Sequence, residues 1–446
     1  MLALLPGYVR CRQGRQGERV YSRLLQGLRH LRPGMSGEKR RKGHPDGKGG
    51  QRMKKMTAVT GNEALAEALR QINPDVCAAY PITPQTDMMQ QFSDFVADGL
   101  VDTEMMLVES EHSALSACIG ASAGGGRVAT ATSGPGLALM WEMLYVASGM
   151  RCPIVMAVVN RALSAPLNIH CDHSDAMGAR DSGWIQLWSE NQQEAYDNLI
   201  MSFRIAEHPG IRLPVMVCMD GFIISHSVGV MDYLSDDAVQ RFVGDFTAQD
   251  ALLDIKRPVS YGPLIVTDQY HEYKKAQNDI MDSVFAVTEA VASEFEYLSG
   301  RRYGLFESYH LEDADIGIVV LNSAAGTCKD IIDNARENGV KVGLLKPRLF
   351  RPFPYTAIAD ALSHLKAVCV LDRSDSFGAF APLYVEIAAS LYPRDQRPVL
   401  LNRIYGLGGR DFMPEHVEAV INEMADIVSR KIAAPQKKYI SLRQYA

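Results

Sequence analysis

Hydrophobic and polar positions follow two different periods along most of the chain. Short apolar runs, typical of strands buried on both faces, alternate with longer stretches in which apolar residues recur every three to four positions, as in helices. The first such series begins at Thr60. Alternation of this kind predicts a doubly wound α/β domain with a parallel sheet. Its expected strands are residues 76–80, 105–108, 127–132, 153–159 and 213–219.

Polar residues mark where the expected helices begin. Thr60 precedes a helix that ends at residue 72, and Glu63 stands three positions later, which is the pattern of a capping box. Pro84 is expected to open the next helix, at a position where its missing N–H costs nothing. Further helices are expected at residues 110–123, 137–150 and 192–207, with a long polar loop at residues 160–183.

A second, smaller series follows an irregular stretch. Residues 225–300 lose the alternation but contain one amphipathic segment, residues 273–296, which we interpret as a bridging helix in a linker. The second series predicts a smaller α/β domain, with strands at residues 315–321, 340–345, 367–371 and 399–403 and a closing helix at 414–431. The expected divisions are 1–55 (basic N-terminus), 56–245 (first domain), 246–305 (linker), 306–435 (second domain) and 436–446 (tail).

The charge is unevenly distributed. Residues 1–55 hold 15 Lys and Arg against 3 Asp and Glu, a balance of +12, whereas the whole chain carries −6. Because Met53 and Met56 stand just before the first regular helix, we favour an over-extended reading frame. A disordered basic extension, a nucleic-acid-binding tail and a targeting peptide stay open, although the apolar core of a secretory signal is missing.

Composition narrows the class of protein further. The chain is 47% apolar and 22% charged, as in soluble globular proteins, and no apolar run approaches the roughly 20 residues that span a bilayer. Its eight cysteines include no C-x-x-C pair, so the sequence encodes neither a zinc site nor an iron–sulfur binding run. We expect a reduced, cytoplasmic protein that binds neither membrane nor nucleic acid through its folded part.

Two polar side chains follow neighbouring expected strands. Thr83 lies between Pro81 and Pro84, so its backbone is nearly fixed, and Glu111 opens a helix after the next strand. Open α/β sheets bind ligands at such strand ends. The alternatives are a helix cap for Thr83 and a plain helix-terminal charge for Glu111. Glu109, two residues earlier, competes for the same role.

Arg161 follows the apolar run at residues 153–159, with Asn160 between them. An arginine there is suited to hold a small carboxylate with two hydrogen bonds, and the alternative is a salt bridge to Asp172 or Asp175. His173 with these two acids falls short of a specific metal site, so we expect a network that orders the loop. No metal ligand set is predicted.

Two glycine-rich turns resemble anion-binding turns. Residues 133–136 read Ser-Gly-Pro-Gly and precede a helix, but they match no nucleotide-binding motif. The backbone N–H groups of Gly406, Gly408 and Gly409, beside Arg410, form a second candidate, for which a plain loop is the favoured interpretation.

Several ordered motifs together resemble one enzyme family. They are similar to those of the α subunits of 2-oxoacid:ferredoxin oxidoreductases, most closely the pyruvate branch, and the resemblance covers about residues 57–432. The motifs are Tyr80–Pro84, Val108–Glu111, Asn160–Ala162, Cys171–Asp175 and Met219–Phe222, with Gly300–Gly304 and Gly408–Asp411 fitting as well.

The resemblance implies a fold, a reaction and roles for the candidate residues. The fold is a pyrimidine-type thiamine-diphosphate-binding domain followed by a transketolase C-terminal-like α/β domain. Glu111 is implied to bond the aminopyrimidine ring, with Pro81 and Ile82 at the cofactor, while Thr83 and Arg161 hold the oxo and carboxylate groups of the substrate. The implied reaction is the reversible oxidative decarboxylation of pyruvate with coenzyme A to acetyl-CoA and CO₂, reducing ferredoxin. Asp172 and His173 are counted as further loop contributors.

The resemblance also implies partner subunits. Thiamine enzymes bind diphosphate and Mg²⁺ through Gly-Asp-Gly followed by Asn, whereas Met219-Asp220-Gly221 lacks the first glycine and the asparagine. A β subunit is therefore expected to bind diphosphate and Mg²⁺, and γ- and δ-type subunits to carry the 4Fe-4S clusters. The alternatives are the same chemistry on branched-chain 2-oxoacids or 2-oxoglutarate, a transketolase-like split thiamine enzyme, and a non-catalytic scaffold.

Overall fold

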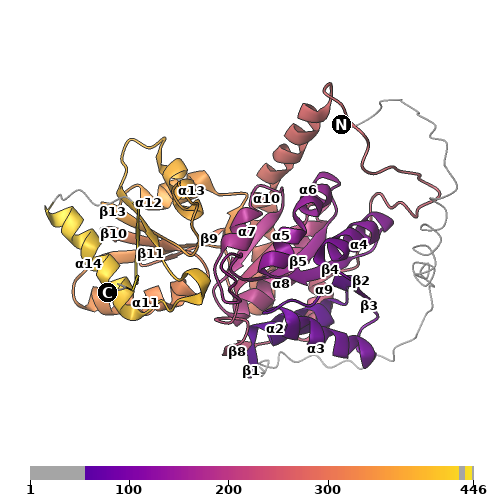
Figure 1. Cartoon of the computed structure of the whole chain (residues 1–446), viewed down its shortest axis with the longest axis horizontal. Coiled ribbons are helices and arrows are strands. Elements are labelled where there is room, and N and C mark those ends of the chain that lie inside the picture. The colour runs from indigo at the N-terminus through magenta and orange to yellow at the C-terminus, as the bar shows by residue number, and fades with distance from the viewer. Residues whose placement is uncertain (1–55, 431–436, 444–446) are drawn as a thin grey trace. The chain divides into compact units, whose positions relative to one another are not determined.

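The computed structural model describes residues 56–430 and 437–443, so the expectations for residues 1–55 lie outside the described residues. Two sheets, each mostly parallel and flanked by helices, organise this part of the chain (Figure 1). We call residues 56–305 the first α/β region and residues 306–443 the second. None of the helices in the described ranges combines the length and the apolar character needed to cross a membrane.

The first region is built on a seven-stranded sheet of order β12-β6-β7-β5-β4-β2-β3. All neighbours are parallel except β12, which comes from the second region and pairs antiparallel with β6. The apolar run expected as a strand forms β5, which is buried throughout and central. The strands are β2 (Val76–Ala79), β3 (Glu104–Leu107), β4 (Val128–Thr132), β5 (Ile154–Asn160), β6 (Ile185–Ser189), β7 (Val215–Asp220) and β12 (Leu349–Arg351).

Helices cover both faces of this sheet, as the doubly wound prediction required. Val155, Ala157 and Val159 of β5 belong to a core with α2, α3 and α8, whereas Ile154 and Val158 belong to a core with α4 and α6. The helices are α2 (Gly61–Ile72), α3 (Thr86–Ala97), α4 (Glu111–Gly124), α5 (Gly134–Leu139), α6 (Trp141–Gly149), α7 (Ser174–Gly178), α8 (Gln192–Glu207), α9 (Asp236–Val243) and α10 (Tyr270–Ser299).

The helices begin only partly where the sequence predicts. The capping box is confirmed, because Thr60 Oγ1 accepts from the Glu63 N–H while the Glu63 carboxylate accepts from the Thr60 N–H at 2.7 Å. The expectation that Pro84 opens a helix is wrong: α3 begins at Thr86, since the Gln85 N–H donates to the Ile82 carbonyl and closes a turn there. The single helix expected at residues 137–150 is two, α5 and α6.

Three strands of the first region, β1, β6 and β8, and two short helices, α7 and α9, were not predicted from the sequence. β1 (Met56–Thr60) and β8 (Val228–Asp232) form a separate antiparallel pair. β6 was missed because its five residues include the polar Gln186, which is buried in the sheet. The bridging helix was expected and corresponds to α10, whose later half packs in the core through Val284 and Phe295.

The second region is built on a six-stranded sheet of order β15-β14-β13-β10-β11-β9. The four expected strands are present, and β9 and β15 add edges that were not expected; β15 lies in the segment interpreted as a tail. The strands are β9 (Phe306–Tyr309), β10 (Ile316–Val320), β11 (Val342–Pro347), β13 (Ala367–Asp372), β14 (Val399–Ile404) and β15 (Lys437–Tyr439). The helices are α11 (Ala324–Glu337), α12 (Tyr355–Leu362), α13 (Pro382–Leu391), η1 (Leu407–Gly409) and α14 (Pro414–Arg430).

Candidate active site

The candidate residues gather at the carboxyl edge of the first sheet. The turn after β2 carries Thr83, Ser133 follows β4, Arg161 follows β5 and Gly221 follows β7, and these four strands run parallel. A Cβ on Gly221 would lie 2.4 Å from the Asn160 carbonyl oxygen, so only glycine permits this approach between neighbouring strand ends. The edge is therefore compact and places polar groups from several strands together.

Glu111 is the first residue of α4 and is only 6% exposed. Ser110 caps the helix by accepting from the Ser113 N–H at 3.2 Å, which leaves the Glu111 carboxylate beside the positive end of the helix. Among the described residues, no donor is hydrogen-bonded to this carboxylate. A buried carboxylate without a partner is costly, which makes it a candidate to bind a ligand.

Gly136 lies close to the side chains of Glu111 and Thr132. A Cβ on Gly136 would lie 2.7 Å from Glu111 Oε1 and 2.6 Å from Thr132 Oγ1, so both side chains border this glycine. The hydroxyls of Thr132 and Ser133 are buried and have no hydrogen-bond partner within the described ranges. Three polar groups with unused hydrogen-bonding capacity thus lie near the start of α4 and α5.

Glu109, the competing carboxylate, is placed differently. It is exposed and accepts a hydrogen bond from Ser113 Oγ at 2.7 Å, and this bond lowers its pKa. It is therefore solvated and bonded to its own helix. The geometry favours Glu111 over Glu109 as a ligand-binding group.

Thr83 and Arg161, although 78 residues apart, are joined by a hydrogen bond. Arg161 Nη1 donates to the Thr83 carbonyl oxygen at 3.0 Å. The turn carrying Thr83, Pro81 and Ile82 is held by Gln85, whose Nε2 donates to the Ala131 carbonyl at 3.0 Å. The interpretation of Thr83 as a helix cap is wrong because Gln85 precedes α3, and the Thr83 side chain stays exposed.

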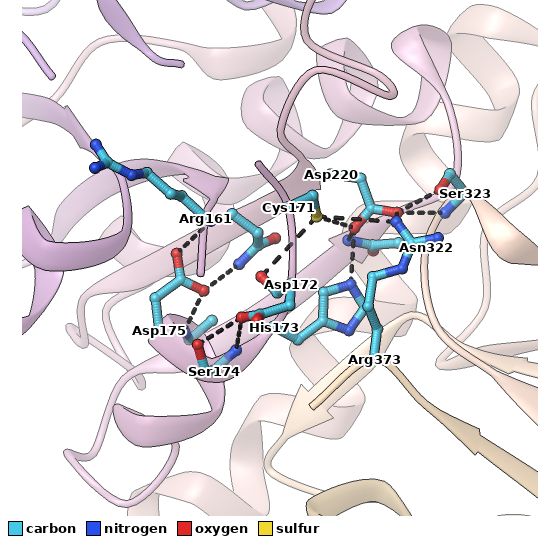
Figure 2. A network of polar contacts seen from close by, with 12 residues as sticks. Arg161, Cys171, Asp172, His173, Ser174, Asp175, Asp220, Asn322, Ser323 and Arg373 are labelled. Atoms are coloured by element: carbon cyan, nitrogen blue, oxygen red, sulfur yellow. Dashed lines mark hydrogen bonds and ion pairs between the residues drawn. The ribbon is translucent and has the colours of Figure 1, made fainter. Parts of the chain in front are cut away.

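Arg161 makes no ion pair with the loop acids. Its side chain is 8% exposed, and its Nε donates to the Asn168 carbonyl at 3.2 Å. Figure 2 shows the guanidinium pointing away from Asp172 and Asp175. The alternative of a salt bridge to either acid is therefore wrong for the described structure. Nη2 has no partner among the described residues and is available to a ligand.

Asp175 organises the backbone around Arg161. Its buried carboxylate accepts from the N–H groups of Gly134 and Arg161, each at 3.0 Å, and from Asn160 Nδ2 at 2.9 Å. Burial raises the pKa of Asp175 to about 6, although these hydrogen bonds lower it. Asp175 thus fixes the turn after β4 to the start of the Arg161 loop.

Asp172 and His173 contact their own loop and β7 rather than Arg161. Asp172 Oδ1 accepts from the Ser174 N–H at 3.0 Å, and His173 Nε2 lies 2.7 Å from Asp220 Oδ1. Cys171 Sγ also contacts Asp220, at 3.3 Å. These contacts order the loop and attach it to the end of β7.

Asp220, which the sequence presented only as part of an incomplete motif, joins the two regions. It is fully buried and accepts from Asn322 Nδ2 and Arg373 Nη1, each at 3.1 Å, and from Ser323 Oγ (Figure 2). Burial would raise the pKa of Asp220, but Arg373 and His173 hold it well below its usual range. The Arg373 guanidinium is thus a positively charged partner of the Asp220 carboxylate at the end of β7.

The comparisons with known proteins match this architecture. The family description "pyruvate flavodoxin/ferredoxin oxidoreductase, thiamine diphosphate-binding" fits residues 67–293, and "pyruvate:ferredoxin oxidoreductase core domain II" fits residues 314–417. The chain belongs to the pyruvate flavodoxin/ferredoxin oxidoreductase family. The predicted family and its thiamine-diphosphate-binding α/β fold class are thereby confirmed.

Curated relatives of this family span most of the chain. Pyruvate synthase subunit PorA of Thermotoga maritima is 51% identical over 394 residues, 88% of this chain and 100% of that protein. Pyruvate synthase subunit PorA of Methanocaldococcus jannaschii is 44% identical, covering 83% and 95%. Ketoisovalerate oxidoreductase subunit VorA of Pyrococcus horikoshii is 40% identical, covering 83% and 94%.

A solved relative shares the fold. The 2-oxoglutarate:ferredoxin oxidoreductase of Magnetococcus marinus superposes with a TM-score of 0.62 at 20% identity, covering 85% of this chain and 66% of that chain. At this identity the likeness concerns the fold alone.

Proposed function

We propose that this chain is the α subunit of a pyruvate synthase, which converts pyruvate and coenzyme A to acetyl-CoA and CO₂ and passes two electrons to ferredoxin. The observation that carries the proposal is the buried Glu111 carboxylate, which has no partner among the described residues and lies at the same sheet edge as Arg161. The PorA relatives, which are named as subunits of pyruvate synthase, support the same reaction.

The residues present fit the aminopyrimidine ring of thiamine diphosphate. Glu111 is an acceptor for a ring N–H, and the unpartnered hydroxyls of Thr132 and Ser133 are further polar groups in its neighbourhood. Pro81 and Ile82 belong to the adjacent turn and are proposed to contact the ring. When bound, the cofactor supplies an acceptor for the electron pair that CO₂ leaves behind.

Arg161 and Thr83 fit a 2-oxoacid. Two donors of the Arg161 guanidinium are used by the carbonyls of Thr83 and Asn168, and Nη2 is available for the substrate carboxylate. The exposed Thr83 hydroxyl is suited to donate to the oxo group. These two residues hold and orient the substrate, while Glu111 acts on the cofactor ring.

The remaining parts are assigned to other subunits. Because Asp220 is bonded to Arg373 and Asn322, we assign the diphosphate and Mg²⁺ to a β subunit. The cysteines at seven described positions are buried, and burial raises the pKa of those at 77, 171 and 218 well above the usual range. The iron–sulfur clusters are therefore assigned to γ- and δ-type subunits that pass electrons to ferredoxin.

A branched-chain 2-oxoacid is the second candidate substrate, because a ketoisovalerate oxidoreductase subunit is 40% identical to this chain. The test is coenzyme A-dependent viologen reduction by the complete complex with pyruvate, 2-oxoisovalerate and 2-oxoglutarate. We expect the highest kcat/KM with pyruvate, and a strong rise of the pyruvate KM in Arg161→Ala. A higher kcat/KM with 2-oxoisovalerate would replace the first candidate with the second, and no reduction with any oxoacid would refute both.

A further inference from the structure

The glycine turn of the second region docks on the loop that follows β5. Gly406, Gly408 and Gly409 have φ values of 64°, 60° and 78°, in the left-handed region that favours glycine. Asn168 Nδ2 donates to the Gly408 carbonyl at 3.0 Å, and the Gly409 N–H donates to the Cys171 carbonyl at 2.6 Å. The turn therefore holds the loop through the Gly408 carbonyl and the Gly409 N–H, so the Gly409 N–H is not free for an anion.

Asn168 connects the glycine turn to Arg161. Its Nδ2 is held by Gly408, and its Oδ1 accepts from the His170 N–H at 2.7 Å. Its main-chain carbonyl accepts from Arg161 Nε at 3.2 Å, and Arg161 Nη1 continues to the Thr83 carbonyl. A continuous line of hydrogen bonds thus runs from the second region to both proposed substrate-binding residues.

We propose that Asn168 is a positioning residue for the substrate carboxylate, with Gly408 as its anchor in the second region. Two carbonyls, one on each side, fix the plane of the Arg161 guanidinium, and the Asn168 carbonyl stays in place only while its side chain is held. This inference rests on the proposed function, because it assumes that Arg161 binds the carboxylate of a 2-oxoacid.

The close contact between Gly408 and the Asn168 side chain can be disturbed by a single substitution. A Cβ on Gly408 would lie 2.4 Å from Asn168 Nδ2, so Gly408→Ala must displace Asn168. Gly339 is a matched control, because its φ of 83° carries the same backbone strain while its Cβ would meet nothing within 4 Å. The pair separates the clash with Asn168 from the general effect of alanine at a positive φ.

The experiment measures kcat and KM for pyruvate in the assembled complex. Asn168→Ala is expected to raise the KM about fivefold, the effect of one lost hydrogen bond of about average strength, while kcat changes less than about twofold. Gly408→Ala should raise the KM similarly, and Gly339→Ala should leave it unchanged. In Asn168→Ala/Gly408→Ala the clash is absent, so its KM should equal that of Asn168→Ala alone.

A second oxoacid distinguishes positioning from direct substrate contact. Pyruvate and 2-oxobutyrate share the carboxylate and differ in chain length, so Asn168→Ala should raise both KM values by the same factor. A changed ratio would mean that Asn168 contacts the substrate side chain, which overturns the proposal. Asn168→Ala truncates a half-buried loop residue and carries the test should Gly408→Ala fail to assemble.

Arg161→Ala distinguishes a failure of the positioning role of Asn168 from a failure of the proposed function. An unchanged pyruvate KM in Arg161→Ala would refute the substrate role of Arg161. A raised KM in Arg161→Ala, with KM values within twofold of the parent in both Asn168→Ala and Gly408→Ala, would leave the proposed function standing and overturn the positioning role.

Discussion

Glu111→Gln is expected to make the chain more stable and the enzyme far less active. Glutamine keeps the shape of the side chain and removes its charge. In the isolated chain the substitution relieves the desolvation of a charged group without a partner, about 1.5–3 kcal/mol, and loses the helix-terminal interaction, about 0.3–1 kcal/mol. The net expectation is an increase in the free energy of unfolding of roughly 0.5–2.7 kcal/mol.

Activity should move in the opposite direction. In the assembled enzyme the carboxylate is proposed to accept a charge-assisted hydrogen bond from the cofactor ring, worth about 1.5–3 kcal/mol. Its loss corresponds to a decrease in turnover of roughly 10- to 150-fold, since each 1.4 kcal/mol is a factor of ten. A gain in stability together with a loss of activity is typical of a group retained for function.

The assay needs two measurements and one control. Urea unfolding of the isolated chain gives the stability, and coenzyme A-dependent viologen reduction by the assembled complex gives the activity. Glu109→Gln is the matched control because Glu109 is exposed two residues away, and it should change neither value appreciably. The reasoning is refuted if Glu111→Gln is less stable than the parent and still oxidises pyruvate at a near-normal rate.

Three further substitutions test the buried charges. Asp220→Ala leaves the buried Arg373 guanidinium without its carboxylate partner and should lower the urea unfolding free energy by about 3–5 kcal/mol. The control Asp313→Ala, at an exposed ion pair, should lower it by less than about 1 kcal/mol. Equal losses in the two variants would contradict the prediction. Lys346→Met removes a buried cation that contacts Glu190, Glu194 and Glu307, leaves only Lys329 beside Glu190 and Glu307, and should lower the urea unfolding free energy by about 3–5 kcal/mol; a loss below about 1 kcal/mol would contradict this. Burial raises the pKa of Asp372 to about 7, so between about pH 4 and pH 7 the folded state binds a proton that the unfolded state does not. The free energy of unfolding should therefore fall as the pH rises through this range. Asp372→Asn should reduce this pH dependence, and an unchanged pH dependence would argue against the assignment.

Sequence patterns were informative where the controlling contacts are local. The apolar run that forms β5 and the capping box at Thr60 depend on neighbouring residues, so their periodicity and spacing were sufficient. The position of Arg161 at a strand end followed from the same argument. The sequence pattern could not distinguish Glu109 from Glu111 as the ligand-binding carboxylate. The difference between them is solvent exposure, which depends on the three-dimensional position of each side chain at the start of α4.

Contacts between residues far apart in the sequence could not be predicted from the hydrophobic periodicity of the chain. The bond from Asn168 to Gly408 spans 240 residues, and that from Asp220 to Arg373 spans 153. The Gly406–Gly409 turn was recognised as unusual, but its partner could not be inferred, because hydrogen bonds to main-chain carbonyls require no particular residue type on the accepting side. The misplaced start of α3 has the same origin, since the buried Gln85 holds the turn through a carbonyl on β4.

The strand β6 is synthesised long before β12, the strand that pairs with its outer edge. β6 is completely buried in the finished fold, and its outer neighbour is synthesised about 160 residues later. At about 5–20 residues per second, this edge waits roughly 8–30 s for its partner strand. During that interval a bare apolar edge is open to pairing with other nascent chains. Production of this subunit should therefore depend on chaperones more than its final stability suggests, and slower translation should lengthen the interval in which aggregation can occur.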